Sequence, residues 1–487
     1  MPTCKILVED EVNCKISGLE LTVRKRLAEK FKYEIPGARY QPAVRLGRWD
    51  GCVSFFSIGG VSYINLLPEI IPMIQNSGYD IELEDTRTYS NTFEFELVTE
   101  SSFESILWPP GHRLENQPLM LNPHQVEVIN NALTNTQSLA IASTGSGKTV
   151  VTAALSQRVE KYGRSVIIVP NKSLVTQTEE DYRLFGLDVG VYYGDRKELG
   201  KNHTICTWQS LDHLIKRTKN GEEGLTIYEF LEDVVCVICD ECHMCKADQL
   251  KSMLSNEFAK VPIRWGLTGT VPKEKFAQAS LLVCLGHVVS VVKAADLQEA
   301  GHLSNCNINV IQLQDYGEFK NYQQELSYLV TTEARLREIS KIITKIKETG
   351  NTLVLVDRIT TGEVLLEMLG DQHAVFVSGS TKNSKRQEEY KNIRCSDDTI
   401  LIATYGVAAV GISIDRIFNL VMIEPGKSFV RVIQSIGRGL RRATDKDFVN
   451  VWDITSSCKY SKRHLTERKK FYRESEYPFV VEKHTWK

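Results

Sequence analysis

Two long parts of the chain alternate short apolar runs with segments of helical periodicity. In the first, from residue 138 to about 295, the runs predict strands at 138–142, 165–169, 188–193, 203–207, 234–239 and 263–267. In the second, from about 350 to 453, they predict strands at 352–356, 374–377, 399–403, 420–423 and 448–452. Short, nearly continuous apolar strands that alternate with helices are typical of parallel sheets covered on both faces. The pattern therefore predicts an α/β fold with two tandem parallel-sheet domains.

The residues ahead of these two domains predict a small mixed α/β unit. We expect helices at Leu19–Phe31 and Leu67–Ile74, and strands at 53–56 and 61–66 around the Gly59-Gly60 turn. The turn-rich stretch at 108–112 marks its boundary. A long amphipathic segment at 322–346 lies between the two larger domains, and a basic helix candidate at 461–473 follows them. We divide the chain into domains 1–105, 106–295 and 296–458 and a basic C-terminal helical tail, 459–487.

The composition indicates an ordinary globular protein without a membrane span. The chain has 487 residues, of which 42% are hydrophobic and 25% charged, as in ordinary globular proteins, and no apolar run approaches a membrane span. Twelve scattered cysteines predict reduced thiols, and the acidic N-terminal stretch does not fit a signal peptide, so we expect a cytoplasmic protein. The net charge of −2 means that any nucleic-acid surface is a local patch.

A glycine-rich stretch, Ala142–Thr149, separates the strand at 138–142 from a helical pattern that begins at residue 150. A strand, a Gly-x-Gly-Lys-Thr turn and a helix in that order predict a loop that binds the phosphates of a nucleotide, whereas the alternative is an ordinary turn. Gly145 and Gly147 let the backbone point N–H groups at phosphate oxygens, Lys148 reaches the β- and γ-phosphates, and the Thr149 hydroxyl takes a place on Mg²⁺. Thr144 and Ser146 complete the candidate ATP-binding loop. An amide at Gln125 could contact adenine, which alone is a weak signal.

Two acids, Asp240 and Glu241, follow the strand at 234–239, at the end where such sheets bind ligands. With the phosphate loop upstream, we expect Asp240 to hold Mg²⁺ and Glu241 to polarise the attacking water, although an Asp-Glu pair can also be a simple turn. Cys236, Cys239, Cys242 and Cys245 imitate a metal-binding signature. Because the first two lie on a buried strand and face opposite sides of it, we interpret them as core residues.

The second α/β domain contains a basic stretch, Gln434–Arg442. Arg438 and Arg441 are three residues apart and share one face of a helix, from which they could stabilise the γ-phosphate of ATP bound by the first domain. In isolation the stretch would be an ordinary basic helix. In the N-terminal unit, Arg45 and Arg48 lie near Tyr40 and Trp49, a composition that fits either a nucleic-acid surface or a solvated face with a buried Trp. The basic tail leaves the same two alternatives open.

The order of these motifs resembles that of superfamily 2 helicases over residues 120 to 455. The resemblance implies two RecA-like motor domains and assigns Gln125 to adenine, and it adds Gln434 to the catalytic arginines. It further implies nucleic-acid contacts by Lys172, Thr176, Gln177, Thr207, Gln209 and Thr404, a nucleotide contact by Gly411, and coupling of hydrolysis to movement by Thr268 and Thr270. Ser413 departs from the family, in which many members have Asp at this position.

Within that superfamily, Tyr40–Gly51, the Asp-Tyr-Arg segment at 181–183 and the basic tail are similar to the UvsW-type helicases of tailed phages. The resemblance implies an ATP-dependent DNA helicase or translocase that migrates Holliday junctions, regresses forks and unwinds R-loops in recombination and repair. It implies branched or single-stranded DNA as partner, RNA within R-loops, no membrane, and a monomer or weak oligomer in the host cytoplasm. The alternatives are an RNA helicase and a nucleotide-gated DNA clamp that does not translocate.

Overall fold

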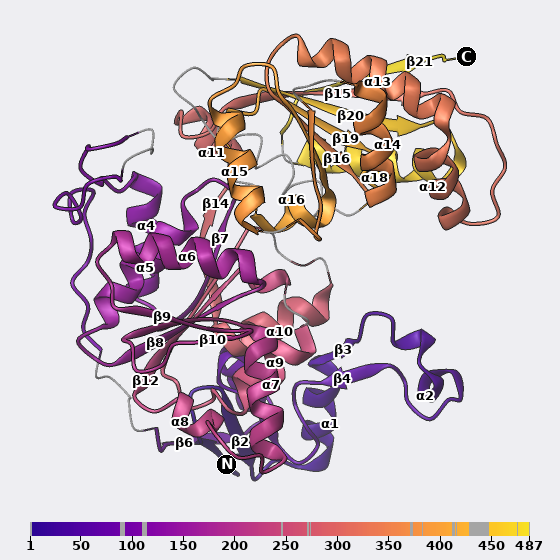
Figure 1. The fold of residues 1–487 in the computed structure, drawn as a ribbon. Helices are drawn as coiled ribbons and strands as arrows, with labels where there is room; N and C mark the ends of the chain where they lie inside the picture. Colours follow the sequence, from indigo (N-terminus) through magenta and orange to yellow (C-terminus); the bar gives the residue numbers. More distant parts are fainter. Residues whose placement is uncertain are drawn as a thin grey trace. The chain divides into compact units, whose positions relative to one another are not determined.

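The computed structural model describes residues 2–486 except 88–92, 110–113, 245, 246, 270, 271, 273, 371–373, 382, 412, 413, 415, 428–447 and 475. The chain forms two compact units, coloured mainly indigo to pink and orange to yellow in Figure 1. Unit 1 comprises Met1–Ala142 and Gly147–Val291, and unit 2 comprises Ser143–Ser146 and Val292–Lys487. The predicted Gln434, Arg438, Arg441 and Thr270, together with Ser413, lie outside the described residues.

A four-stranded sheet opens unit 1, with the strand order β5-β2-β1-β6. Its strands are β1 (Thr3–Val8), β2 (Asn13–Ser17), β5 (Val61–Tyr63) and β6 (Asp80–Asp85). β1 pairs in parallel with β6, and the other pairs are antiparallel. Alternate residues of β1 and β2 are buried, so one face of the sheet belongs to the core under α1 (Leu21–Lys30) and α3 (Leu67–Gln75).

The prediction for residues 1–105 is confirmed for its two helices and wrong about how its strands are arranged. The two predicted strands appear as β4 (Cys52–Ser54) and β5, but β4 pairs with β3 (Lys32–Glu34) and β5 pairs with β2. They therefore belong to different sheets. β1, β2 and β6 were not predicted, because their polar alternate residues interrupt the apolar runs on which the prediction relied.

The N-terminal sheet is packed against the first α/β domain through shared hydrogen bonds and a shared core. Nε2 of Gln137 donates to the Glu11 carbonyl at 2.6 Å, and Nδ2 of Asn65 donates to Oε1 of Gln137 at 2.9 Å. Phe55 of the N-terminal part meets Phe276 edge to face, with 5.8 Å between ring centroids. Both rings belong to one continuous apolar cluster, so residues 1–105 cannot be removed without opening the core of unit 1.

The main sheet of unit 1 has the order β10-β9-β11-β8-β12-β13-β7-β14. Its strands are β7 (Gln137–Ala142), β8 (Arg164–Val169), β9 (Val189–Tyr193), β10 (Arg196–Lys197), β11 (His203–Thr207), β12 (Val234–Asp240), β13 (Ile263–Thr268) and β14 (His287–Val292). The six predicted strands are confirmed, and those six pair in parallel. The helices of this part are α4 (Pro123–Leu133), α5 (Lys148–Val159), α6 (Lys172–Leu184), α7 (Trp208–Lys219), α8 (Ile227–Phe230), α9 (Ala247–Ser255) and α10 (Lys275–Leu285). As predicted for core residues, Cys236 and Cys239 are fully buried on β12.

Unit 2 is built on a seven-stranded parallel sheet of order β17-β18-β16-β19-β20-β15-β21. Its strands are β15 (Asn305–Leu313), β16 (Thr352–Val356), β17 (Ala374–Val377), β18 (Ile400–Thr404), β19 (Asn419–Ile423), β20 (Phe448–Ser456) and β21 (Phe479–His484). The helices include α11 (Ala294–Glu299), α12 (Tyr322–Thr331), α13 (Glu333–Lys347), α14 (Ile359–Leu369), α15 (Asn383–Arg394), α16 (Tyr405–Gly411) and α18 (Lys459–Glu474). The predicted amphipathic segment is therefore two helices, separated at Thr332.

The predicted basic tail is wrong as a separate element. Its helical part is present as α18, but β21 follows and pairs in parallel with β15 at the edge of the sheet. On α18, the Arg468 side chain is only 2% exposed and donates to both carboxylate oxygens of the fully buried Asp453, at 2.8 and 2.9 Å. The burial of Arg468 could not be predicted, because α18 contains many basic residues and the sequence does not distinguish a buried arginine from a solvated one.

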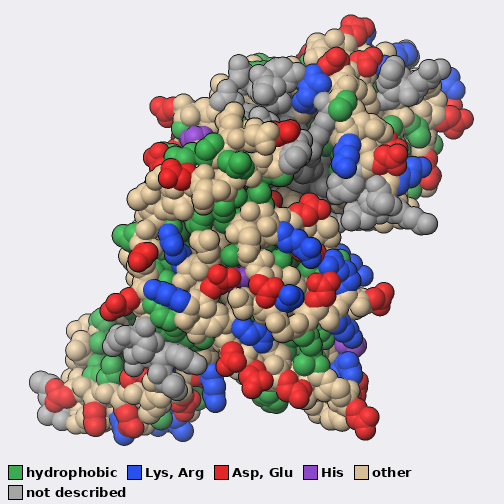
Figure 2. Space-filling view, turned by 60° about the vertical axis from the view of Figure 1, so that its left-hand side comes forward, with side chains coloured by type: hydrophobic (Ala, Val, Ile, Leu, Met, Phe, Trp, Pro, Cys, Tyr) green, Lys and Arg blue, Asp and Glu red, His purple; other side chains and the backbone are tan. Residues whose placement is uncertain are grey.

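The surface carries charges of both signs. In Figure 2, Lys and Arg side chains are interspersed with Asp and Glu side chains instead of gathering into one large field, in keeping with the net charge of −2. Among the described residues, none of the helices is long and apolar enough to cross a membrane.

Candidate functional site: the phosphate loop and the pocket beside it

The turn between β7 and α5 is shaped by two glycines. Gly145 and Gly147 have φ angles of +90° and +81°, a region that side chains with a Cβ rarely adopt. A Cβ on Gly147 would also lie 2.2 Å from Nε2 of Gln125, which is itself buried. The chain then enters α5, a 12-residue helix whose first residue is Lys148. The tight turn and the helix N-terminus fit the phosphates of a nucleotide, because both present backbone N–H groups.

Lys148 and Glu241 are 93 residues apart in the sequence and meet at this loop. Nζ of Lys148 lies 3.1 Å from Oε1 of Glu241 and donates to the Ala142 carbonyl at 3.1 Å. Both side chains are mostly buried, with 10% and 14% of their surfaces exposed. β7 and β12 end at the same edge of the parallel sheet, and this places the two groups together.

Glu241 is held in a strained backbone conformation. Its φ is +48°, and for a residue with a side chain such a conformation costs on the order of 1–3 kcal/mol. Its own N–H donates to Oδ1 of Asp240 at 2.9 Å, and its Oε2 accepts the N–H of Gly269 at 3.2 Å. These bonds aim the carboxylate at Lys148. Strain that the surroundings maintain in this way is a mark of functional sites.

The two acids of this pair differ in how readily they ionise. Burial and the neighbouring charge of Glu241 raise the pKa of Asp240 above its ordinary value, and Lys148 opposes this only in part. Burial alone would raise the pKa of Glu241 as well, but Lys148 and His243 outweigh it and hold that pKa below its usual range. Carboxylate and hydroxyl oxygens are the kind of ligand that Mg²⁺ binds. Asp240 and the half-buried Thr149 therefore fit the predicted metal ligands.

The His243 ring contacts both Glu241 and the end of β13. Nδ1 of His243 lies 3.3 Å from Oε2 of Glu241 and 2.7 Å from Oγ1 of Thr268. Burial lowers the pKa of His243, although Glu241 opposes the shift, so the ring favours its neutral form. The predicted catalytic base Glu241 and the predicted coupling residue Thr268 are thus both within contact distance of one imidazole. The sequence alone did not assign a role to His243, although this residue follows the predicted catalytic pair Asp240 and Glu241 by two positions.

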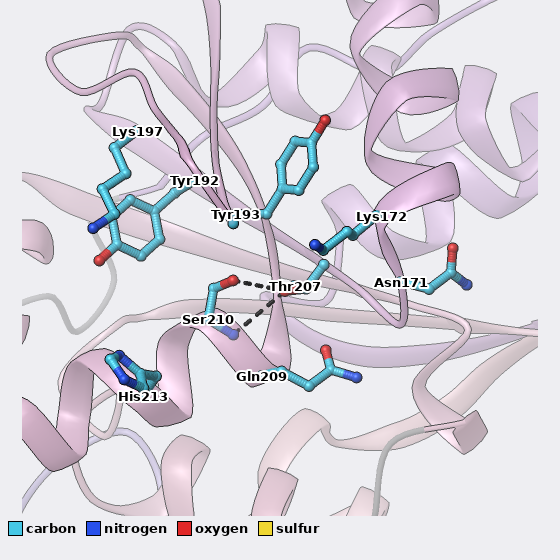
Figure 3. Close-up of a pocket in the computed structure, with 10 residues that line it drawn as sticks. Asn171, Lys172, Tyr192, Tyr193, Lys197, Thr207, Gln209, Ser210 and His213 are labelled. Carbon is cyan, nitrogen blue, oxygen red and sulfur yellow. Dashed lines mark hydrogen bonds between the residues drawn. The ribbon is translucent and has the colours of Figure 1, made fainter. Parts of the chain in front are cut away.

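A pocket of about 510 Å³ opens on unit 1, where β8, β9 and β11 end (Figure 3). It is lined by Asn171, Lys172, Tyr192, Tyr193, Gly194, Lys197, Thr207, Gln209, Ser210 and His213. Asn171 and Thr207 cap the N-termini of α6 and α7, where their side chains accept from Leu174 and Ser210. Two helix N-termini and two lysines favour an anion, and the tyrosines offer faces for stacking.

Some of the residues predicted to contact nucleic acid line this pocket. Lys172, Thr207 and Gln209 line it, whereas Thr176 and Gln177 lie further along α6 and are half-buried. In unit 2, Thr404 ends β18 and Gly411 ends α16. Tyr192, Tyr193, Lys197 and His213 were missed, because no recognised motif contains them. A signal that could have found them is the position of Tyr193 at the end of a predicted strand of the same sheet.

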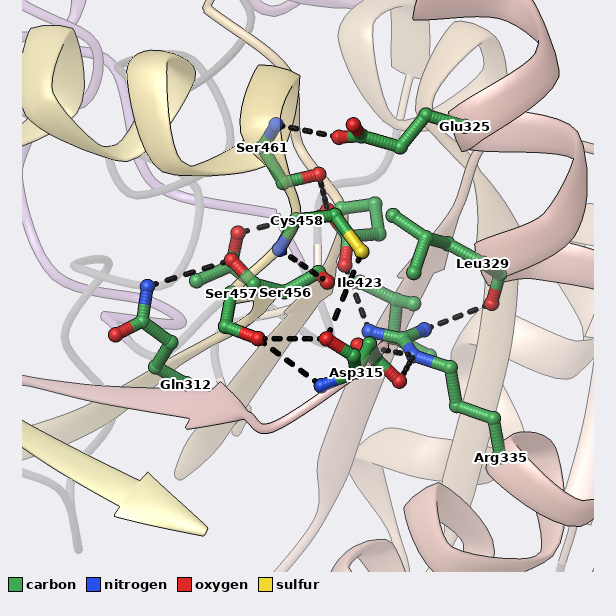
Figure 4. Close-up of polar contacts among 12 residues, drawn as sticks. Gln312, Asp315, Glu325, Leu329, Arg335, Ile423, Ser456, Ser457, Cys458 and Ser461 are labelled. Carbon is green, nitrogen blue, oxygen red and sulfur yellow. Dashed lines mark hydrogen bonds and ion pairs between the residues drawn. The ribbon is translucent and has the colours of Figure 1, made fainter. Parts of the chain in front are cut away.

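A buried charge cluster in unit 2 has a structural role (Figure 4). The fully buried Arg335 donates to the Asp315 carboxylate at 3.1 Å, to Oε1 of Glu424 at 2.7 Å and to the Leu329 carbonyl at 2.7 Å. Glu325 accepts the N–H groups of Tyr460 and Ser461 in the first turn of α18. The cluster joins α12, α13, β19 and α18, so it holds the C-terminal segment in the domain.

Comparison with known proteins agrees with this geometry. Residues 118–273 match the family described as type III restriction enzyme, res subunit, and residues 334–443 match the helicase conserved C-terminal domain. The chain is a superfamily 2 helicase. The helicase accordingly hydrolyses ATP. It has two RecA-like domains, which follow a small N-terminal domain with a mixed sheet in the sequence.

Three similar proteins show how much of the helicase is shared. It is 24% identical over 489 residues to the ATP-dependent DNA helicase uvsW of enterobacteria phage T4, covering 96% of this chain and 93% of that protein. The fold is similar to the DNA-bound type ISP restriction-modification enzyme LlaBIII, with a TM-score of 0.56 and 14% identity over 87% of this chain and 36% of that one. It is also similar to Saccharomyces cerevisiae Dbp5 bound to RNA and ADP BeF3, with a TM-score of 0.54 and 14% identity over 74% and 90% of the two chains.

Proposed function

We propose that this helicase couples ATP hydrolysis to movement on DNA and remodels branched substrates, by migrating Holliday junctions, regressing forks and unwinding R-loops during recombination and repair. The observation that carries the proposal is that the Lys148–Glu241 pair and the anion-favouring pocket lie at the carboxyl ends of strands in one sheet. The choice of DNA is supported by the similarity to the ATP-dependent DNA helicase of phage T4 over nearly the whole of both chains. The choice of branched substrates is supported by the resemblance of Tyr40–Gly51 to the UvsW-type helicases.

The chemistry assigns a task to each group near the phosphate loop. The loop residues 144–149 bind the phosphates of ATP, and Lys148 leaves Glu241 for the β- and γ-phosphates. Glu241, freed from that ion pair, orients the attacking water. Asp240 and Thr149 would hold Mg²⁺, which neutralises phosphate charge when bound. Gln125 contacts adenine, and Gln434, Arg438, Arg441 and Gly411 complete the ATPase in the way their motifs predict.

His243 and Thr268 link the ATPase to the nucleic acid in this proposal. Departure of Lys148 changes the charge facing His243, whose ring already bonds to Thr268. Thr268 and Thr270 then transmit the state of the nucleotide, while Lys172, Thr176, Gln177, Thr207, Gln209 and Thr404 hold one strand.

An unwinding assay across forks, four-way junctions, R-loops and blunt duplex tests the function. We expect ATP-dependent unwinding of the branched substrates and none of the blunt duplex, and no unwinding by Glu241→Gln. ATPase stimulation by single-stranded RNA that equals stimulation by forked DNA would instead support an RNA helicase, which the fold shared with RNA-bound Dbp5 keeps as the second candidate. DNA binding that depends on ATP without unwinding or translocation would indicate a clamp.

A further inference from the structure

An arm of about 20 residues projects from the N-terminal part of unit 1 (Figure 1). Its stem is the antiparallel pair β3 and β4, in which Lys32 pairs with Ser54 and Glu34 with Cys52. The tip comprises residues 35–51 and contains a short 3₁₀ turn, Ala38–Tyr40, and the single helical turn α2, Pro42–Arg45.

The tip has a small core of its own. Ala38 is 1% exposed, and a Cβ added to Gly51 would lie 3.1 Å from the Ala38 methyl group. The Trp49 ring is half-buried, and its Nε1 donates to the Cys52 carbonyl at 2.9 Å. The partial burial and this hydrogen bond hold the Trp49 ring against the base of the tip.

The outer surface of the tip is basic and partly apolar. Arg39, Arg45 and Arg48 are exposed, and residues 35–49 include no acid. Tyr40 and Leu46 are exposed to 69% and 65%, although both are large apolar side chains. The Arg39 guanidinium lies 4.8 Å from the centre of the Tyr40 ring and donates to its hydroxyl at 2.8 Å, so the ring is held in place. A fixed aromatic ring among cations suits nucleic acid, because bases stack on it while arginines bind phosphates.

The base of the arm is fastened to the helix that follows the coupling segment. Phe55, next to β4, packs on Phe276 in the first turn of α10, and Nζ of Lys251 lies 4.4 Å from the centre of the Phe55 ring. α10 begins seven residues after Thr268. The arm is therefore attached to the first motor domain at its base.

We propose that the tip of this arm binds DNA at a branch point, with Tyr40 stacked on the exposed face of the terminal base pair and Arg45 and Arg48 on the flanking phosphates. The proposal rests on the DNA helicase function proposed above and adds the substrate feature that the arm recognises. DNA is favoured over an acidic protein because a flat exposed base pair matches the fixed ring as well as the charge. In this proposal the arm makes the helicase bind junctions in preference to other DNA, while the pocket on unit 1 binds a single strand of any sequence.

The first experiment measures stacking. A forked DNA carries 2-aminopurine in the last base pair before the fork, and its fluorescence is followed during titration with the full chain. We expect a fluorescence change that Tyr40→Ala abolishes, together with a roughly 5- to 150-fold loss of fork affinity, the range that follows from 1–3 kcal/mol per stacked base. Tyr228→Ala removes another exposed tyrosine of unit 1, 74% exposed, and is expected to behave as wild type. An unchanged signal in Tyr40→Ala would overturn the stacking contact.

The second experiment measures phosphate contacts. For Arg45→Ala/Arg48→Ala, the slope of log affinity against log salt concentration for forked duplex falls in magnitude by about 1.8, since each lost contact contributes about 0.9. Lys30→Ala removes an exposed charge of α1 outside the arm and should alter the slope little. A slope equal to that of wild type in the double variant would overturn the phosphate contacts.

Failure of the arm and failure of the proposed function give different results. All the substituted side chains are exposed, so each variant should unfold at the temperature of wild type. If the wild-type chain unwinds forks and Tyr40→Ala does so equally well, the arm proposal is wrong and the helicase function stands. If the wild-type chain shows no DNA-stimulated ATPase, the function itself is wrong. Where the arm proposal is right, Tyr40→Ala keeps ATPase stimulation by single-stranded DNA and loses the added stimulation by forks.

Discussion

The ammonium of Lys148 lies 3.1 Å from the carboxylate of Glu241, so two groups to which we assign separate tasks on a nucleotide neutralise each other in this structure. The pair keeps two mostly buried charges compensated. A phosphate that takes Lys148 also frees the carboxylate, which links nucleotide binding to the readiness of Glu241.

Glu241→Gln is expected to lower the ATPase turnover number by at least about 100-fold, because the water loses the group that orients and polarises it. ATP affinity should stay equal or increase, since the amide competes less for Lys148. Steady-state ATPase and binding of a fluorescent ATP analogue measure the two effects. Glu180→Gln, on the exposed side of α6, is the control. Normal turnover in Glu241→Gln would rule out this assignment.

Gly147→Ala is expected to abolish ATP binding and to lower stability. The alanine would have to adopt a φ of +81°, and its Cβ would lie 2.2 Å from Nε2 of Gln125. Gly186→Ala separates the two causes, because Gly186 has a φ of +71° with open space around it. That control should lose only about 1 kcal/mol of unfolding free energy and keep ATP binding. Equal ATP affinity in the two variants would contradict the role of the loop.

Thr268→Val is expected to preserve ATP binding and to weaken stimulation of the ATPase by DNA, because it removes the hydroxyl that contacts His243 at 2.7 Å. The matched control is Thr204→Val. Thr204 is also buried on a strand of the same sheet, and among the described residues its hydroxyl has no hydrogen-bond partner. The ratio of DNA-stimulated to basal turnover is the measurement, and a ratio that falls equally in both variants would exclude a specific coupling role.

Arg468→Met is expected to destabilise unit 2 by about 3–5 kcal/mol, because it leaves the Asp453 carboxylate buried without its cation. Adding Asp453→Asn should recover part of that loss. Removal of residues 459–487 should prevent unit 2 from folding, since it deletes α18 and the edge strand β21. Chemical denaturation and limited proteolysis report these changes. A truncated chain with an intact, protease-resistant unit 2 would show that the segment is a dispensable tail after all.

His203 predicts a pH dependence of stability. It is fully buried at the start of β11, between Ser165 at 2.5 Å and Glu160 at 2.9 Å. Burial lowers its pKa, while Glu160 opposes the shift, so the folded chain favours the neutral ring and the unfolded chain binds the proton more readily. The stabilisation is therefore complete above the unfolded pKa of about 6.5 and is lost as the pH falls below it. The difference in melting temperature between wild type and His203→Gln should shrink from pH 8 to pH 5.5. A constant difference would contradict this.

The predictions from sequence were most accurate for the buried parallel strands. Most of them are apolar along much of their length, so a short apolar run indicates them directly. All eleven predicted strands of the two large domains appear in the structure. They were least accurate for strands with one solvated face or at an edge, such as β1, β2, β15 and β21. In these strands alternating polar residues interrupt the apolar run, or a basic helix lies next to the strand in sequence. The apolar pattern therefore did not predict them.

Sequence by itself determined the phosphate loop, the acids after β12 and the order of motifs, because the chemistry of ATP hydrolysis demands particular residue types at short spacings along the chain. Only the tertiary structure decided which of these groups meet. The 3.1 Å contact of Lys148 with Glu241, the imidazole between Glu241 and Thr268, and the rigid tip that carries Tyr40 depend on strand order and packing between segments far apart in sequence. Local residue patterns do not specify those distances.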